Sequence, residues 1–254
     1  MPNNPRPKVC AIIAAAGKSS RMNPAQETTY GQSKQFIEIS GKTVIEKTVA
    51  VFNSCRYIDE IIIAAKPEDT EKMREIIENA DLRKIKNITA GGETRIESVF
   101  KAVREAGEDI DFIAIHDGAR CFISGEDIER VILKAIETGA AAAGTKVTDT
   151  IKRVKYANGG NYITETVDRD FLWAVQTPQV FRKDMYLQAM DIVICKSADD
   201  ANNKNNNIVT DDCAIMENAG YPVSIVECSK YNIKITDTQD LVFLNLFESM
   251  GYGG

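Results

Sequence analysis

Short apolar runs alternate along this chain with longer stretches in which apolar residues recur at helical spacing. The apolar runs have strand length and lie at 9–14, 60–65, 85–89 and 111–115. The stretches predicted to be helical lie at 43–53, 67–80, 93–106 and 124–138. Strands that are apolar throughout are typical of a parallel sheet with both faces covered. The pattern therefore predicts an α/β fold with a mostly parallel sheet and helices on both faces.

Side chains at the ends of the predicted helices support these boundaries. Thr43 and Glu46, and again Ser124 and Asp127, have the spacing of a capping box at a helix start. Gly139 follows the last helical residue, where glycine commonly ends a helix. We expect both helices to begin and end at these positions.

The regular alternation stops near residue 148. Residues 148–154 and 162–167 are predicted strands, and the Asn-Gly-Gly-Asn sequence at 158–161 is a predicted turn between them. They would form a β-arm at about 148–170. Because an isolated hairpin is only marginally stable in water, we expect the arm to pack on another subunit or on the domain.

The C-terminal part returns to strands and helices. It is predicted to contain an Asn-rich surface loop at 197–207, a helix capped by Thr210, strands at 222–226 and 232–235, and a final helix that begins at Thr236. No internal repeat or clear linker divides the chain, so a single domain is expected over residues 1–254, with the β-arm as an extension.

Composition excludes several classes of protein. The net charge of −6 and the pI near 5.1 argue against a nucleic-acid-binding protein, which usually carries a basic excess. The six cysteines form no C-x-x-C pair, so we expect reduced, mostly buried thiols. No targeting signal or membrane-spanning segment is recognisable, and a cytoplasmic protein that does not bind membranes is expected.

The loop after the first strand is the strongest candidate for a site, because ligands of parallel sheets lie beyond the carboxyl ends of the strands. It reads Ala14-Ala15-Ala16-Gly17-Lys-Ser-Ser-Arg21. Small residues let the backbone N–H groups approach and bind phosphate oxygens. Arg21, and Lys34 further on, could add positive charge. The loop is neither a Walker A motif nor a dinucleotide fingerprint, and an ordinary turn with exposed basic residues remains the alternative.

Two later loops extend this candidate site. Gly92 belongs to a Gly-Gly pair between a strand and a helix, which allows close approach of a flat base, and Ser98 can reach back toward it. Asp117, at the carboxyl end of the strand 111–115, is well placed to bind Mg²⁺. A structural role is favoured for His116, the only histidine. For each loop, a plain turn is the alternative.

The absence of an obvious general base also indicates a chemistry. A phosphomonoester is already an anion near neutral pH and needs no side chain to deprotonate it. Transfer to such a nucleophile requires positioning and neutralisation of charge. Arg169, near the end of the arm, and Lys234, within an apolar segment, are further cations; a solvated Lys234 is the alternative. Together these residues favour nucleotidyl transfer between two polyanions.

The ordered set of motifs resembles the 2-C-methyl-D-erythritol 4-phosphate cytidylyltransferases of non-mevalonate isoprenoid biosynthesis. The similarity covers about residues 9–244. Its motifs are AAAGKSSRM, SKQF, GGETRIESV, HDGAR, VTDTIKRV, TVDRDFLWAVQTPQVF, VTDDCAIMENAG and NIKITD. The resemblance implies a Rossmann-like sheet, a homodimer joined through the β-arm, and CMP transfer from CTP to a small polyol phosphate with Mg²⁺ or another divalent cation.

The resemblance also implies a role for each matched residue. Residues Ala14–Gly17 would wrap the triphosphate, and Gly92 and Ser98 would recognise cytosine. The other implied roles are transition-state stabilisation by Arg21 and Lys34, Mg²⁺ binding by Asp117, positioning of the methylerythritol phosphate by Arg169 and Lys234, entry of Thr150 and Arg169 into the partner subunit's site, and supporting contacts by Arg120, Thr177 and Thr210.

Two alternatives remain open from the sequence. A ribitol-5-phosphate or other polyol-phosphate cytidylyltransferase would use the same chemistry, and Tyr231 before Asn232 is reminiscent of the ribitol enzymes. A catalytically silent nucleotide-binding protein on the same fold would bind CTP without turnover. A dehydrogenase is disfavoured because the dinucleotide fingerprint is missing.

Overall fold

A seven-stranded sheet forms the centre of the molecule. A computed structural model describes residues 6–17, 33–80, 82–157, 159–199, 209–236, 238–249 and 251. Within these residues the strand order is β11-β7-β10-β6-β1-β4-β5. The strands are β1 (Val9–Ala15), β4 (Glu60–Ala65), β5 (Ile85–Ala90), β6 (Phe112–Asp117), β7 (Ala140–Lys146), β10 (Trp173–Arg182) and β11 (Ser224–Glu227).

The sheet is mostly parallel, as the sequence predicts. Only β10 runs antiparallel to its neighbours, β6 and β7. Strands β7 and β10 were not predicted. The run of four alanines in β7 carries a weak hydrophobic signal, and β10 contains two buried glutamines, Gln176 and Gln179, that interrupt its apolar pattern. The pairing of β10 with β7 is irregular between Val175 and Gln179.

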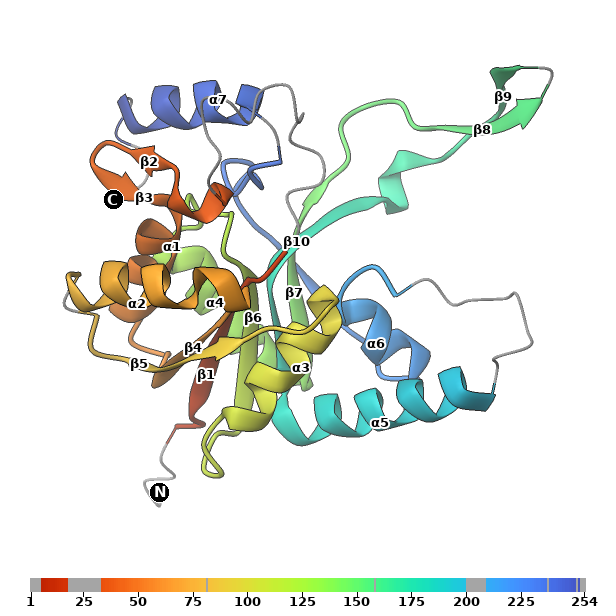
Figure 1. Ribbon diagram of the computed structural model, residues 1–254. Helices are drawn as coiled ribbons and strands as arrows, with labels where there is room; N and C mark the ends of the chain where they lie inside the picture. Colours follow the sequence, from red (N-terminus) through yellow and green to blue (C-terminus); the bar gives the residue numbers. More distant parts are fainter. Residues whose placement is uncertain are drawn as a thin grey trace.

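Helices cover both faces of the sheet (Figure 1). Alternate residues of β1 point to opposite faces, so Ile13 packs in one apolar cluster and Ile12 in the other. The first cluster lies against α1 (Val44–Ser54), α2 (Thr70–Glu78) and α4 (Gly125–Thr138). The second lies against α3 (Arg95–Glu105), α5 (Lys183–Asp199) and α6 (Asp212–Asn218). Among the described helices, none is long and apolar enough to cross a membrane.

Two small elements lie at the carboxyl end of the sheet, near α7 (Thr238–Ser249) (Figure 1). They are the short 3-10 helix at Lys34–Phe36 and the small hairpin of β2 (Glu38–Ile39) and β3 (Lys42–Thr43). A second 3-10 helix, Pro67–Asp69, begins the segment predicted to be helical from residue 67.

All six cysteines are free, and only Cys195 among them is exposed.

The predicted helix ends are confirmed at three positions. The Thr43 hydroxyl accepts from the Glu46 N–H at 3.3 Å, and the Ser124 hydroxyl accepts from the Asp127 N–H at 3.1 Å. Gly139 ends α4 with a φ of +89°, a conformation that L side chains rarely adopt.

Two predictions in the C-terminal part are wrong. Asp211, not Thr210, caps α6, because its carboxylate accepts from the Ala214 N–H at 3.1 Å. The segment 232–235 is not a strand. Its Ile235 N–H donates instead to the Ala119 carbonyl at 2.9 Å, so this segment lies along the loop after β6. The loop predicted at 197–207 falls partly in α5, and its residues 200–207 lie outside the described residues.

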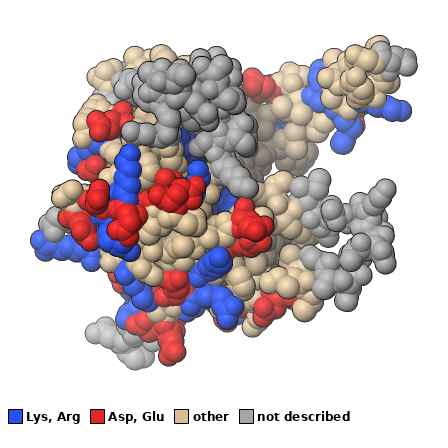
Figure 2. Space-filling model, in the orientation of Figure 1, with Lys and Arg blue, Asp and Glu red and all other residues tan. Residues whose placement is uncertain are grey.

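The arm extends away from the sheet (Figure 1) as the antiparallel pair β8 (Lys152–Ala157) and β9 (Gly160–Thr166). The hairpin begins at Lys152 rather than at the predicted residue 148. Both strands are exposed along most of their length, and Figure 2 shows Lys and Arg side chains gathered on the arm. Its apolar side chains therefore remain uncovered in a single chain.

Candidate active site

The carboxyl ends of β1 and β6 lie side by side, as the parallel sheet requires. In the register of the two strands, Ala14 is aligned with Asp117. A narrow cavity opens at this edge. It is lined by Ala14, Ala16, Gly17, Lys34, Gln35, Arg95, Ser98, Asp117, Ala119 and Lys234. Seven of these ten residues were candidates from the sequence. Arg21 lies outside the described residues.

The Gly-Gly loop after β5 packs closely against the loop after β1. A Cβ atom on Gly91 would lie 2.6 Å from the Ala16 Cβ atom and 2.7 Å from the Ser98 Oγ atom, so no larger residue fits there without movement. The Gly92 N–H donates to Ser98 Oγ at 2.9 Å, and the Ser98 hydroxyl donates to the Thr94 carbonyl at 2.7 Å. Ser98 therefore fixes the conformation of the loop that carries Gly92.

Asp117 is the centre of a cluster of cations. Its Oδ1 atom lies 3.3 Å from Arg95 Nε, and its Oδ2 atom lies 2.9 Å from Lys234 Nζ and 3.4 Å from Arg120 Nε. Burial alone would raise the pKa of Asp117, but the charges of these three cations outweigh it, and the pKa lies well below its usual range. Asp117 is therefore ionised at neutral pH.

Lys34 brings a fourth cation to the same place. Its Nζ atom donates to the Ile235 carbonyl at 3.0 Å, and Ile235 directly follows Lys234. Arg120 is anchored nearby, because its NH1 atom donates to the Asn232 carbonyl at 2.7 Å. Lys234 is thus not simply solvated. Segments far apart in the sequence converge on one region rich in cations.

Two buried side chains, Thr177 and His116, hold the backbone of Asp117 through a chain of hydrogen bonds. His116 Nε2 lies 3.2 Å from the Arg120 carbonyl, which can only accept, so this nitrogen carries the hydrogen. His116 Nδ1 then accepts from the Thr177 hydroxyl at 3.1 Å. The same hydroxyl accepts from the Asp117 N–H at 3.0 Å. Both side chains are buried, which agrees with a structural role for His116.

The buried His116 makes stability depend on pH. Burial lowers the pKa of His116 to about 4 from a usual value of 6.5. The unfolded chain therefore binds a proton that the folded chain excludes, and stability that is complete above pH 6.5 is lost as the pH falls toward 4. We expect a loss of roughly 3 kcal/mol from this group. Urea unfolding of the wild type and of His116→Gln between pH 7.5 and 4 measures this loss. An equal dependence of the free energy of unfolding on pH in both proteins would show that His116 is not its source.

Three exposed candidate residues do not line this cavity in the single chain. Thr150 and Arg169 are exposed near the base of the arm, where Arg169 NH1 donates to the Thr148 carbonyl at 2.5 Å. Thr210 is exposed just before α6. The first two would have to act on the site of a second subunit to take the role that the sequence resemblance implies.

Arg95 and Gln35 line the cavity but were not candidates from the sequence. Gln35 donates from its amide to the Ala15 carbonyl and so braces the loop after β1. Arg95 is the first residue of α3. A basic residue is unfavourable at a helix N-terminus, because the helix dipole is positive there. A positive charge at this unfavourable position was the signal that could have identified Arg95 as a site residue.

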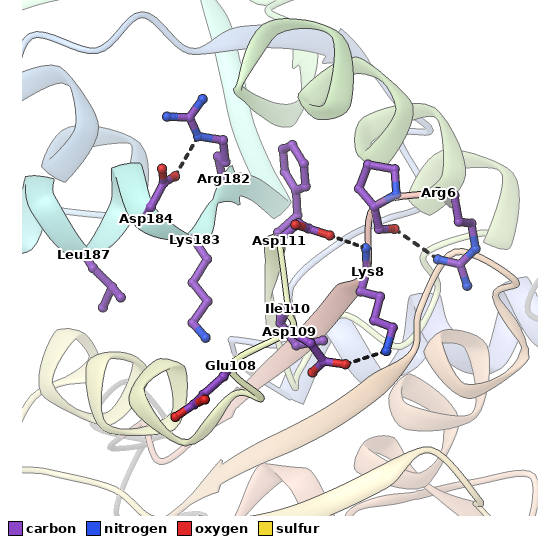
Figure 3. A pocket seen from close by; sticks show the side chains of 12 residues that line it. Arg6, Lys8, Glu108, Asp109, Ile110, Asp111, Arg182, Lys183, Asp184 and Leu187 are labelled. Carbon is purple, nitrogen blue, oxygen red and sulfur yellow. Dashed lines mark hydrogen bonds and ion pairs between the residues drawn. The ribbon is translucent and has the colours of Figure 1, made fainter. Parts of the chain in front are cut away.

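A larger cavity of about 760 Å³ lies at the opposite, amino-terminal edge of β1 and β6 (Figure 3). Its charged side chains largely satisfy one another. Arg182 Nε pairs with Asp184 at 2.6 Å, Lys8 pairs with Asp109, and Lys183 donates to the Gly107 carbonyl at 2.7 Å. Size therefore does not identify the site, and the unbalanced positive charge favours the narrower cavity.

Comparisons with known proteins identify the family of this chain. The family model described as 2-C-methyl-D-erythritol 4-phosphate cytidylyltransferase matches residues 9–247. A relative of that name from Clostridium tetani is 41% identical over 240 residues, which are 94% of this chain and 90% of the relative. The relative from Halalkalibacterium halodurans is 37% identical over 232 residues, 91% of this chain and 93% of the relative.

Solved structures give the same result. The crystal structure of 4-diphosphocytidyl-2C-methyl-D-erythritol synthase from Anaerococcus prevotii matches with a TM-score of 0.79 at 27% identity and covers 96% of each chain. The 2-C-methyl-D-erythritol 4-phosphate cytidylyltransferase from Thermus thermophilus matches with a TM-score of 0.69 at 27% identity, over 95% of this chain and 99% of that one. The chain belongs to the 2-C-methyl-D-erythritol 4-phosphate cytidylyltransferase family.

Proposed function

We propose that this chain transfers CMP from CTP to 2-C-methyl-D-erythritol 4-phosphate and releases pyrophosphate. One observation supports this proposal most strongly. Arg95, Arg120 and Lys234 contact the carboxylate of Asp117 at the carboxyl edge of the sheet, and Lys34 lines the same cavity. This excess of positive charge suits a reaction between two polyanions, a nucleoside triphosphate and a phosphomonoester.

In the proposed reaction, a phosphate oxygen of the acceptor attacks the α-phosphorus of CTP. A new phosphorus–oxygen bond forms, and the bond from the α-phosphorus to the leaving pyrophosphate breaks. The attacking oxygen is already charged, so no general base is required. The backbone N–H groups of Ala14–Gly17 would bind the triphosphate, Lys34 and Arg21 would stabilise the charge that develops at phosphorus, and Lys234 would hold the acceptor phosphate.

The Gly91–Gly92 loop would recognise the cytosine base. Its backbone is held by Ser98 and lies against Ala16, beside the proposed triphosphate loop. The absence of side chains on both glycines would let a flat ring lie close to the backbone. A base that binds here would place its phosphates over residues Ala14–Gly17.

We also propose that Asp117 holds Mg²⁺ or another divalent cation. Among the described residues, no three His, Cys, Asp or Glu side chains form a complete metal site. Mg²⁺, however, is usually bound through one or two carboxylates together with substrate phosphates. Asp117 fits this requirement, because it is ionised and lines the cavity. The bound cation would neutralise charge on the triphosphate and on the departing pyrophosphate.

A pyrophosphate-release assay tests the proposed function. CTP is supplied with Mg²⁺ and with either 2-C-methyl-D-erythritol 4-phosphate or ribitol 5-phosphate, and UTP and ATP serve as nucleotide controls. We expect turnover with CTP and the methylerythritol phosphate. Much faster turnover of ribitol 5-phosphate would favour the alternative acceptor. CTP binding without turnover of either acceptor would favour a catalytically silent protein.

We further propose that the protein is a homodimer joined through the arm. Phe171, Tyr156 and Ile163 are 83%, 72% and 66% exposed, and apolar side chains gathered in this way usually mark an interaction surface. In such a dimer, Thr150 and Arg169 of one subunit would reach the site of the other. A cytoplasmic location also stays a prediction.

Sedimentation equilibrium tests the dimer, with an expected mass of twice 28.1 kDa. We expect Ile163→Glu to shift the protein toward the monomer and to lower its activity, because the arm would leave the second site. Ile194→Glu, at a 49% exposed position on α5, is the matched control and should leave both unchanged. A fully active monomer would remove the role proposed for the arm.

A further inference from the structure

A fully buried carboxylate lies behind the cation cluster. Asp212 is the first residue of α6, and its side chain has no exposed surface. Its two oxygens have different partners. Oδ1 accepts from the Tyr186 hydroxyl at 2.8 Å, and Oδ2 lies 2.6 Å from Arg95 NH1. Tyr186 is itself wholly buried and stacks on Phe181, so its hydroxyl has a fixed position.

Arg95 connects this buried carboxylate to the cavity. Its NH1 atom pairs with Asp212, while its Nε atom faces Asp117 Oδ1 at 3.3 Å. The two carboxylates together outweigh the effect of burial and raise the pKa of Arg95, so its charge is permanent. Because the guanidinium group is planar and rigid, holding NH1 on Asp212 also fixes the direction of Nε.

The two oxygens of Asp117 therefore meet two kinds of cation. Oδ1 faces Arg95, which is tied to a second carboxylate, whereas Oδ2 faces Lys234 and Arg120. Within the described residues, Lys234 pairs with Asp117 alone among the carboxylates and has a flexible side chain, so it can turn toward an anionic substrate. Arg95 cannot follow a substrate without separating from Asp212.

We propose that Asp212 and Tyr186 are positioning residues that hold Arg95 against Asp117 and so keep the Asp117 carboxylate in one orientation while substrates bind and react. This inference rests on the proposed function, since it concerns the same site. A buried ion pair is not by itself evidence of stability, because apolar residues often replace such pairs without loss. Here the pair leaves one edge of Arg95 on the cavity wall, which an exclusively structural pair would not require.

The test compares kcat and KM of Asp212→Asn with those of the wild type in the pyrophosphate-release assay. The amide keeps the volume and one acceptor for Tyr186 but removes the charge that holds Arg95. We expect kcat to fall about 10- to 100-fold, the usual loss when a group that orients a site residue is removed. KM for CTP should change little, because other groups bind the nucleotide.

Two further variants separate positioning from general stability. Tyr186→Phe keeps the charge of Asp212 and removes one hydrogen bond, so a fall in kcat of about fivefold is expected. In an Arg95→Met background, Asp212→Asn should cause no additional fall, because Asp212 acts through Arg95. An equal fall in both backgrounds would overturn the proposal.

Asp59→Asn is the matched control at the opposite edge of the sheet. Asp59 also pairs with an arginine, Arg6, at 2.7 Å, and accepts from the Val9 N–H at 2.8 Å. This variant should lose stability but keep its kcat. If Asp212→Asn does not fold, Tyr186→Phe and Arg95→Met decide: unchanged kcat in both overturns the proposal. A wild type that does not turn over would instead contradict the proposed function.

Discussion

Lys34→Ala should lower kcat about 10²-fold or more, the usual cost of losing one preorganised charge contact in an active site. Lys34 projects from the 3-10 helix at Lys34–Phe36, and its ammonium group is held at the cavity by the Ile235 carbonyl at 3.0 Å. Its position is therefore set before substrates bind. In the variant, charge that develops on the phosphoryl oxygens in the transition state would lose this partner. CTP in the ground state would still bind to the loops after β1 and β5.

The measurement is steady-state kinetics with CTP and 2-C-methyl-D-erythritol 4-phosphate. Lys34→Arg keeps the charge with a different shape and should recover part of kcat. Lys42→Ala, an exposed lysine on the neighbouring strand β3, is the matched control and should behave as the wild type. A near-normal kcat in Lys34→Ala would show that the role assigned to this lysine is wrong.

The strands and loops of the first half could be predicted because their local signals agree with the fold. The predicted strand Glu60–Ala65 is apolar after its first residue, and β4 has the same bounds. The rule that ligands lie at the carboxyl ends of parallel strands placed Ala14 near Asp117, and the register of β1 and β6 aligns them. Each inference needed only neighbouring residues and one rule of topology.

Contacts between distant segments could not be predicted in this way. Lys234 was assigned to a strand because it lies among apolar residues, but Asn232 and Ile235 are held by side-chain and loop contacts rather than by a sheet. The partner of Arg95, Asp212, lies 117 residues away in the sequence. Nothing in the local pattern specifies such a pair, since it depends on how α3 and α6 pack on the same face of the sheet.

Asp117→Asn should have the largest effect, a fall in kcat of about 10³-fold, which is at the upper end for the loss of one electrostatic contact. The amide has almost the same shape but removes the negative charge that Arg95, Arg120 and Lys234 share. Arg120 and Lys234 would then repel each other, while Arg95 would stay paired with Asp212. If Asp117 also holds Mg²⁺, the concentration of Mg²⁺ that gives half-maximal activity should rise.

Asp212→Asn separates the two roles of Asp117, because it removes a neighbouring negative charge but leaves the Asp117 carboxylate in the cavity. It should lower kcat without raising the Mg²⁺ requirement, whereas Asp117→Asn should change both. Circular dichroism at the assay temperature verifies that each variant is folded. Were Asp117→Asn to keep an unchanged Mg²⁺ requirement, the metal would be held without Asp117. Were it also to keep its kcat, the cation cluster would not be the centre of the reaction, since its central carboxylate could be removed without consequence.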